Sequence, residues 1–224
     1  MTIRLLLIRH ARVDFDSRNF RRTGRGRQWD PPLGEEGTEQ ALRLAARLSM
    51  MEAPAAVFVS PFLRCRQTLQ PYLEALGKGA PVANVVEDLG EVFIGRWEGM
   101  SFEDILAGDD ELARRFREQE AMFSLAPGGE SGPELRSRVV PAVEKALASA
   151  TSGTVMVVTH GGVINAYLGH VMHVSHDMFF LPDNASINTV DVEGDRRSMR
   201  FLNDARHLTD PGVFLPPASA ARRD

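Results

Sequence analysis

The stretch from Ile3 to Arg12, with the sequence IRLLLIRHAR, constrains the fold of this chain more than any other. It begins with a short apolar run that only Arg4 interrupts, which is typical of a strand buried on both faces of a sheet. The run stops at Arg9-His10-Ala11-Arg12, where two guanidinium groups flank an imidazole. Ligands of open α/β sheets bind at the carboxyl ends of strands, so this stretch predicts a ligand site. A basic, solvated strand end is the alternative.

Two later apolar runs, Ala55–Val59 and Thr154–Val158, end in the same way. The first is followed by Ser60-Pro61-Phe62-Leu63-Arg64 and the second by Thr159-His160-Gly161-Gly162. A helical pattern follows each, and this alternation of strand and helix predicts a largely parallel sheet. A strand, a histidine, two glycines and a helix start in succession favour anion binding, because helix-start amides point at the ligand.

The other predicted elements complete a three-layer α/β/α fold with a mostly parallel central sheet and a small helical cap. The segment Asp14–Asp30 is polar and rich in arginine, and it predicts a loop at the mouth of the crevice. The remaining elements are a helix from Glu35 with Ala41, Leu42, Ala45 and Leu48 on one face, a strand at Val82–Val86, an acidic helix opened by Ser101 and Asp104, a charged helix at Asp109–Met122, a helix capped by Ser131 and Glu134 with Leu135, Val139, Val143 and Leu147 on its core face, and a hairpin of Ile187–Val192 and Met199–Leu202 at a sheet edge.

The 224 residues predict a single domain over residues 1–209, with the cap inserted at about 100–126 and a weakly ordered tail at 210–224. The hydrophobic fraction of 43% and the charged fraction of 25% are ordinary for a soluble protein. No apolar run approaches the ~20 residues of a membrane span. The lone Cys65 excludes an internal disulfide and a cysteine-cluster metal site. We therefore expect a cytoplasmic protein without a membrane partner, in which Cys65 is a small buried hydrophobe.

Charge is unevenly distributed along the chain. Residues 1–28 hold eight arginines and two aspartates, whereas residues 87–120 hold eleven acidic side chains and four arginines. The basic segment favours an anionic partner. No nucleic-acid motif is present, so we expect a small phosphorylated molecule and not a nucleic acid.

Phosphoryl transfer needs the side chains that follow the predicted strands. Arginine forks bind two phosphate oxygens at once, so Arg9 and Arg64 suit a phosphate ester. A neutral imidazole such as that of His10 can attack phosphorus and form a phosphohistidine. The departing alkoxide needs a proton, which a carboxylic acid such as Glu91 in its glycine-flanked loop can donate.

Six motifs in order resemble the histidine phosphatase (phosphoglycerate mutase-like) superfamily over roughly residues 3–170. They are Leu7-Ile8-Arg9-His10-Ala11, Pro32-Leu33-Gly34-Glu35-Glu36-Gly37 with Gln40-Ala41, Ser60-Pro61-Phe62-Leu63-Arg64-Cys65-Arg66-Gln67-Thr68, Leu89-Gly90-Glu91 with Gly95-Arg96-Trp97-Glu98-Gly99, Pro127-Gly128-Gly129-Glu130-Ser131, and Val158-Thr159-His160-Gly161-Gly162-Val163-Ile164. Each is weak alone, but the set in this order is highly specific.

The resemblance implies a role for each of five residues. His10 is the implied nucleophile, and Arg9, Arg64 and His160 complete the phosphate pocket. Glu91 is the implied proton donor. The resemblance implies no cofactor and no metal, because the guanidiniums supply the positive charge. Glu87, Asp88 and Glu98 lie close to Glu91 in the sequence and are rival donors.

The chain departs from the family pattern after the nucleophile. Ala11 stands where the family usually has Gly, and Asp16 stands near the position of an expected Asn. Asp16 would repel phosphate unless Arg12 or a later loop arginine neutralises it, and Thr23-Gly24 is an alternative source of loop contacts. The predicted substrate-binding residues are therefore Arg12, Asp16, Thr23, Gly24 and Gly161.

Three functions remain open at this point. The first is a metal-independent phosphomonoesterase that hydrolyses small phosphorylated metabolites through a phosphohistidine on His10. The second is a cofactor-dependent mutase of the phosphoglycerate type, which the acidic segment 100–126 disfavours because it would repel a doubly anionic acid. The third is a regulatory module that binds a phospho-ligand. Sugar, nucleotide-like and α-ribazole-type phosphates all remain candidate substrates, and a homodimer remains open.

Overall fold

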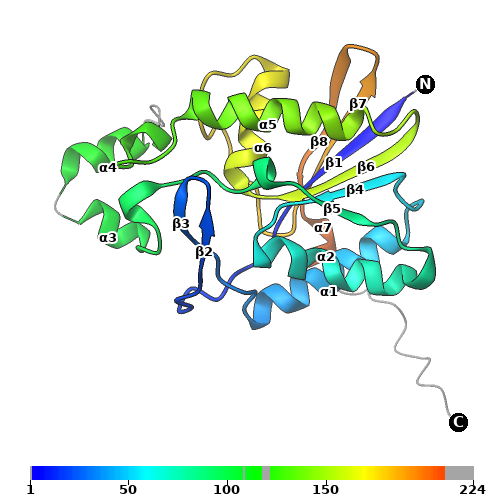
Figure 1. Ribbon diagram of the computed structural model, residues 1–224, viewed down its shortest axis with the longest axis horizontal. Helices are drawn as coiled ribbons and strands as arrows, with labels where there is room; N and C mark the ends of the chain where they lie inside the picture. Colours follow the sequence, from blue (N-terminus) through cyan, green and yellow to red (C-terminus); the bar gives the residue numbers. More distant parts are fainter. Residues whose placement is uncertain (1, 108, 118–121, 210–224) are drawn as a thin grey trace, which may run out of the picture.

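The central feature of the protein is a six-stranded sheet (Figure 1). The structure is a computed structural model that describes residues 2–107, 109–117 and 122–209. The strand order is β5 (Ala83–Val85), β4 (Ala56–Val59), β6 (Gly153–Thr159), β1 (Ile3–Arg9), β7 (Ile187–Glu193) and β8 (Arg196–Asp204). The first four run parallel, and β7 is antiparallel to both β1 and β8. The predicted mostly parallel sheet and the terminal hairpin are therefore confirmed.

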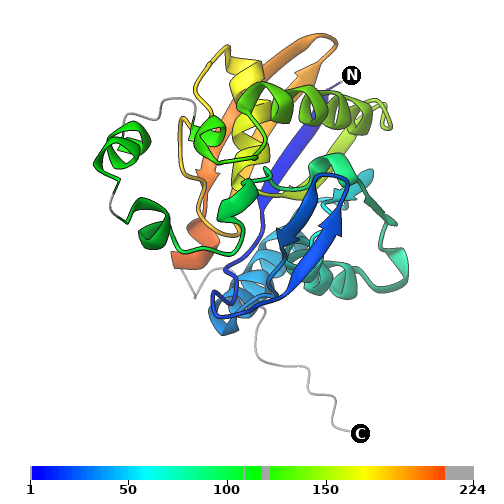
Figure 2. The same ribbon diagram turned by 60° about the vertical axis from the view of Figure 1, so that its left-hand side comes forward.

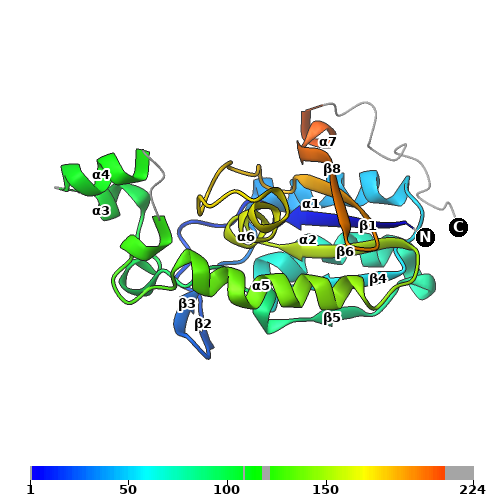
Figure 3. The same cartoon turned by 90° about the horizontal axis from the view of Figure 1, so that it is seen from above.

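Strand β1 is apolar and buried from Leu5 to Ile8, because helices cover both faces of the sheet. Its Leu5 and Leu7 pack in one core cluster, while Leu6 and Ile8 pack in the other. Figures 1 and 3 show the two helical layers on opposite sides of the sheet, which confirms the three-layer prediction. The first layer comprises α5 (Gly132–Leu147) and α6 (Gly161–Met172), and the second comprises α1 (Glu35–Ser49), α2 (Leu63–Leu76) and α7 (Arg206–Thr209).

The start and the core face of α5 agree with the sequence. The Ser131 hydroxyl accepts a hydrogen bond from the Glu134 backbone N–H, and the Glu134 carboxylate accepts one from the Ser131 backbone N–H at 2.8 Å. These reciprocal bonds satisfy backbone donors that a helix start leaves unpaired. Leu135, Val139 and Val143 are completely buried against the sheet.

The predicted core face of α1 is correct except at Leu42. The Leu42 side chain is 55% exposed, and Leu44 is buried with Ala41, Ala45 and Leu48. A helical period of 3.6 places positions 41, 44, 45 and 48 on one stripe, whereas residue 42 lies about 100° away from residue 41.

The segment 14–30 differs from the predicted loop because it contains a β-hairpin (Figure 2). Its strands are β2 (Phe20–Thr23) and β3 (Gly26–Trp29), which pair antiparallel. Gly26 closes the turn with a φ of +140°, a conformation that side chains disfavour. Strands of four residues that are mostly polar carry no clear alternation, so the sequence pattern gave no signal for them.

Two short helices follow the loop that carries Glu91. They are α3 (Phe102–Leu106), where the Ser101 hydroxyl accepts from the Asp104 N–H as predicted, and α4 (Asp110–Arg117). The charged helix was predicted to reach Met122, but residues 118–121 lie outside the described residues, and Met122 begins the 3-10 turn η4 (Met122–Leu125). In Figures 1 and 3 these helices project beyond the end of the sheet toward which β1 points, and not over one of its faces.

Three further 3-10 turns lie between α2 and α3, and they are η1 (Gly77–Gly79), η2 (Glu87–Leu89) and η3 (Gly95–Trp97). The described helices include none that is long and apolar enough to cross a membrane. The predicted weakly ordered tail at 210–224 lies outside the described residues.

Candidate active site

The carboxyl ends of the adjacent strands β4, β6 and β1 meet at one edge of the sheet, where a pocket of about 390 Å³ opens. Five of the predicted site residues line this pocket: Arg9, His10, Arg64, Glu91 and Gly161. They come from β1, the start of α2, the loop after η2 and the start of α6. The parallel sheet therefore brings together residues that lie up to about 150 positions apart in the chain.

His10 is held as a neutral imidazole. Its Nδ1 lies 2.8 Å from the carbonyl oxygen of Ala11. A carbonyl can only accept a hydrogen bond, so we assign the proton to Nδ1 and the free lone pair to Nε2. Burial, and then the charges of Arg64 and Arg9, lower the pKa of His10 well below its ordinary value. The ring is thus in the protonation state of a nucleophile.

The backbone of His10 is fixed from two sides. Its N–H donates to the Thr159 carbonyl at 2.9 Å, and its carbonyl accepts from the Asn184 side chain at 3.0 Å. The Ala185 N–H donates to the same carbonyl at 3.1 Å. Ala11, where the family usually has Gly, is fully buried and does not have a positive φ. This backbone conformation therefore does not require glycine.

The two arginines beside His10 are aligned by fixed acceptors. Arg9 donates from one terminal nitrogen to the Pro182 carbonyl, while its buried Nε has no partner among the described residues. Arg64 donates to the Trp29 carbonyl at 3.2 Å and lies 3.6 Å from an Asp30 carboxylate oxygen. Buried donors are normally satisfied, so the free Nε of Arg9 indicates that this site takes up an acceptor, such as an oxyanion.

Glu91 is half-buried at the pocket, and desolvation by the surrounding protein raises the pKa of its carboxyl group above the ordinary value. Its position depends on Arg138, which pairs bidentately with Glu130 through two contacts of 2.7 Å. The same guanidinium donates to the carbonyls of Gly90 at 2.8 Å and Glu91 at 3.2 Å. The Arg138 fork therefore fixes the backbone of the loop that presents Glu91.

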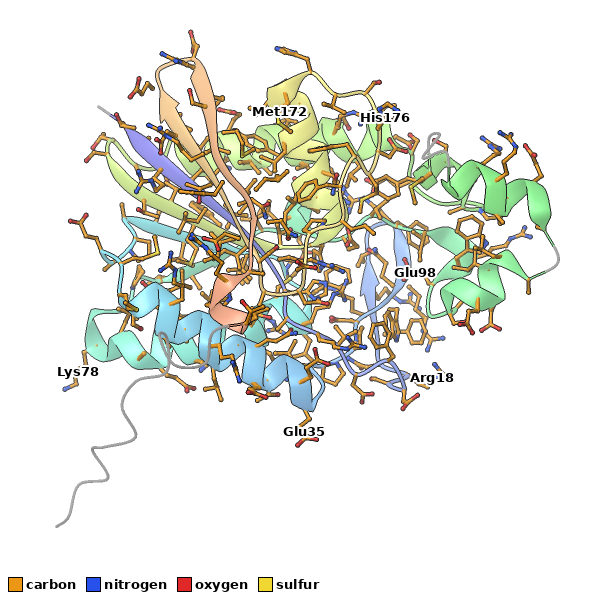
Figure 4. All side chains as sticks on the ribbon, turned by 180° about the vertical axis from the view of Figure 1, so that it is seen from behind. Arg18, Glu35, Lys78, Glu98, Met172 and His176 are labelled. Carbon is orange, nitrogen blue, oxygen red and sulfur yellow. The ribbon has the colours of Figure 1, made fainter. Side chains whose placement is uncertain are left out.

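The rival carboxylates have other roles in the structure. Glu98 lines the pocket, but its two oxygens accept from the backbone N–H groups of Trp29 at 2.8 Å and Ile94 at 3.1 Å. Figure 4 shows Glu98 beside the β2–β3 hairpin. Glu87 and Asp88 do not line this pocket. The Glu91 carboxylate accepts one backbone hydrogen bond, from the Val92 N–H to Oε1 at 2.9 Å, and no second backbone donor among the described residues contacts it.

His160 lies behind His10 and is not among the residues that line the pocket. It is completely buried, and its ring meets the ring of His10 edge-on at a centroid distance of 5.2 Å. The Ser60 hydroxyl lies 2.7 Å from Nε2 of His160. Burial, and then the charge of Arg64, lower the pKa of His160 well below its ordinary value. His160 is therefore a neutral ring that packs against His10.

Cys65 lies beside this histidine, with its Sγ 3.5 Å from Nε2 of His160. The thiol is fully buried, and burial raises its pKa to about 12. It stays protonated and is no nucleophile, which confirms the prediction of a small buried hydrophobe.

The structure does not bring four of the predicted loop residues, namely Arg12, Asp16, Thr23 and Gly24, to this pocket. Arg12 pairs with Glu36 at 3.3 Å, and Asp16 is exposed. Thr23 and Gly24 line a neighbouring pocket.

Two arginines of the β2–β3 hairpin instead form ion pairs with the acidic segment before Glu91, which lies next to the hairpin in space. Arg21 lies 3.2 Å from Glu87, and Arg25 lies 3.6 Å from Asp88. The basic and acidic segments that the sequence showed as separate are therefore partly complementary, and their contact joins the hairpin to the loop before Glu91.

Sequence reasoning missed several pocket residues. Gln28 and Trp29 lie in the segment that was expected at the crevice mouth, so a positional signal existed without naming them. Phe62 was inside the motif around Arg64. Asn184 had no local signal, because only the tertiary fold brings it to His10, 174 positions away.

No group of three His, Cys, Asp or Glu side chains suited to a metal ion occurs in residues 2–107, 109–117 and 122–209.

Comparison with known proteins identifies the family. The profile of the histidine phosphatase superfamily (branch 1) matches residues 5–205. The chain belongs to the histidine phosphatase superfamily. A metal-independent phosphoserine phosphatase from Arabidopsis thaliana is 28% identical over 211 residues, which are 94% of this chain and 85% of that protein.

Two solved structures are similar over nearly the whole fold. Bacillus stearothermophilus YhfR has a TM-score of 0.75 at 25% identity, and the match covers 92% of this chain and 99% of that one. A mycobacterial glucosyl-3-phosphoglycerate phosphatase, solved with VO3, has a TM-score of 0.73 at 28% identity, with coverages of 89% and 98%. The predicted family, the α/β fold class and the predicted phosphatase (hydrolase) activity are therefore confirmed.

The substitution Gly162→Ala tests whether the reaction depends on the position of the Glu91 carboxylate. A Cβ atom at this position would lie 2.6 Å from Oε1 of Glu91, so the carboxylate must move in Gly162→Ala. The sequence predicts Glu91 as the proton donor, and displacement of such a group by about 1 Å costs up to about 100-fold in rate, so we expect kcat to fall by about 10- to 100-fold. Steady-state kinetics on an alkyl phosphate, with thermal unfolding alongside, measures the effect.

Gly24→Ala is the matched control, because no atom lies within 4 Å of the added Cβ and no positive φ is required there. We expect it to keep the wild-type kcat. A Gly162→Ala enzyme with wild-type kcat would show that the position of Glu91 does not limit the reaction.

Proposed function

We propose that this phosphatase hydrolyses small phosphomonoesters by transferring the phosphoryl group to Nε2 of His10 and then to water, without a metal ion. One observation carries the proposal: Nδ1 of His10 is committed to the Ala11 carbonyl, so the lone pair of the neutral ring resides on Nε2 beside two arginines. The name of the Arabidopsis relative, a metal-independent phosphoserine phosphatase, supports the same chemistry.

In the first half-reaction, Nε2 attacks phosphorus as the bond to the alcohol oxygen breaks. Arg9 and Arg64 bind the phosphoryl oxygens, and the unpartnered Nε of Arg9 supplies one donor. Glu91, whose raised pKa favours a protonated carboxyl group, gives its proton to the leaving oxygen. The products are the free alcohol, a phosphohistidine and a Glu91 carboxylate.

In the second half-reaction, the Glu91 carboxylate takes a proton from water as the water oxygen bonds to phosphorus. The N–P bond breaks, its electron pair returns to Nε2, and inorganic phosphate leaves. Nδ1 keeps its proton throughout, because the Ala11 carbonyl holds it. Each residue is thereby restored for the next turnover.

A mutase would need to hold a second anionic group while the phosphoryl group returns to another hydroxyl. Among the described residues that line the pocket, the cationic side chains are Arg9 and Arg64, and both lie beside His10. The pocket therefore favours hydrolysis over transfer to an anionic acid.

His10→Ala should abolish turnover, because the nucleophile is lost. Wild-type enzyme quenched during turnover of a radiolabelled monoester should carry label, and His10→Ala should carry none. All assays contain EDTA, which should leave the wild-type rate unchanged. His176→Ala is the control, since His176 is exposed on the surface (Figure 4). Near wild-type hydrolysis by His10→Ala would contradict the covalent mechanism, and loss of wild-type activity in EDTA would contradict metal independence.

Glu91→Gln should depend on the leaving group. General acid catalysis is worth about 10²–10⁴-fold, and an alkoxide needs it far more than p-nitrophenolate does. We expect kcat/KM to fall by about 100-fold or more for an alkyl phosphate but by less than about tenfold for p-nitrophenyl phosphate. Glu87→Gln, an exposed carboxylate outside the pocket, should show neither loss. Equal losses on both substrates would assign Glu91 an electrostatic or structural role.

The pH dependence follows from the two shifted groups. The rate should rise with pH through the lowered pKa of His10, because the protonated ring has no lone pair on Nε2. It should fall with pH through the raised pKa of Glu91, because the ionised carboxylate cannot donate a proton. A kcat/KM profile on an alkyl phosphate should therefore have an acidic optimum, and Glu91→Gln should lose the alkaline limb. An alkaline limb that persists in Glu91→Gln would contradict the assignment.

A further inference from the structure

The active-site pocket has two chemically different parts. Its base carries the charged groups around His10, whereas its outer wall is apolar. Chain segments that are distant in sequence contribute to this wall, which includes Phe15, Trp29, Ile94, Met122, Met178 and Leu181. A phosphate seated on Arg9 and Arg64 would direct the alcohol half of the ester along this wall.

The apolar wall continues to the surface. Phe15 is 62% exposed and Leu181 is 76% exposed, and both line the pocket. Phe15 also packs near Trp29, with ring centroids 6.1 Å apart. Exposed apolar side chains that adjoin a pocket indicate a binding surface more strongly than scattered ones do.

The charges that line the pocket disfavour a ligand with a second anionic group. Among the described residues that line it, the cations are Arg9 and Arg64, which the phosphoryl group occupies. The other charged groups are Glu91 and Glu98, which are acidic. The nearby Arg21 and Arg25 line a separate pocket, where they pair with acidic residues. A second anion on the substrate would therefore meet apolar side chains, amides and carboxylates, and no further cation among the described lining residues would compensate its desolvation. Arg12 lies over the Phe15 ring at 5.7 Å from its centroid, but it does not line the pocket and pairs with Glu36.

We propose that the substrate is a phosphomonoester with an uncharged, apolar alkyl or aryl alcohol half, and that the pocket selects against a carboxylate there. This inference rests on the proposed hydrolysis at His10 and narrows its substrate class. It separates this chain from the substrate named for the Arabidopsis relative, because phosphoserine carries a carboxylate beside its ester.

The test compares kcat/KM of the wild-type enzyme for ethyl phosphate, pentyl phosphate and 4-carboxybutyl phosphate. The last two differ only by a terminal methyl or carboxylate. Burial of each methylene group should raise kcat/KM by about fourfold, so the kcat/KM of pentyl phosphate should exceed that of ethyl phosphate by at least tenfold. It should exceed 4-carboxybutyl phosphate by at least tenfold as well.

Two results would overturn the inference: equal or higher kcat/KM for the carboxylate ester, or no increase from ethyl to pentyl phosphate. In both cases the esters are still hydrolysed, so the proposed function would stand. If neither the alkyl esters nor p-nitrophenyl phosphate is hydrolysed, the proposed function fails and the inference fails with it.

Leu181→Arg tests where the alcohol half lies, because it adds a cation at the exposed mouth of the pocket. It should raise the ratio of kcat/KM for 4-carboxybutyl phosphate over pentyl phosphate by about tenfold. Addition of 0.5 M salt should reduce this gain, because salt shortens the screening length, which falls to about 3 Å at 1 M. Val82→Arg is the control, since Val82 is 81% exposed and does not line the pocket. A thermal unfolding midpoint equal to that of the wild-type enzyme confirms folding. A ratio unchanged in a folded Leu181→Arg enzyme would contradict the proposed path of the alcohol half.

Discussion

The placement of a buried guanidinium, that of Arg64, and a half-buried one, that of Arg9, beside a neutral imidazole is the constraint on which the rest of this structure depends. Burial and the charges of Arg64 and Arg9 together keep His10 unprotonated, and the buried Nε of Arg9 has no acceptor among the described residues. Such an arrangement is costly until an anion arrives. In the proposed mechanism a phosphoryl group satisfies the cations and meets a nitrogen lone pair at the same place, so binding and attack share one geometry.

The surrounding fold serves to hold these groups still. Asp30 accepts from the Leu63 N–H at the start of α2 and lies 3.6 Å from Arg64, so it fixes both a helix start and one of the pocket arginines. Arg138 fixes the backbone of the Glu91 loop by donating to the Gly90 carbonyl, while its ion pair with Glu130 holds the guanidinium in place. Desolvation lowers the pKa of His10 and raises that of Glu91, because it disfavours the imidazolium cation in the first and the carboxylate anion in the second.

The pocket combines this polar base with an apolar outer wall. The proposed hydrolysis needs only the polar base, since the proposed attack, charge neutralisation and proton transfer all occur within it. The wall comes from the hairpin, the segment around Met178 and the loop after Glu91. These segments lie outside the central sheet, so they can change the accepted alcohol without altering the position of His10.

The sequence by itself determined the parallel core and predicted most of the polar residues that meet at the pocket. A continuous apolar run requires cover on both faces, and parallel strands present their carboxyl ends at one edge, so Arg9, His10 and Arg64 could be placed together before any coordinates. Only the tertiary structure decided the β2–β3 hairpin, the position of His160 behind His10, and the approach of Asn184 from 174 residues away. The reason is physical: local patterns encode which faces are buried, whereas contacts between polar segments depend on distances that only the packed chain sets.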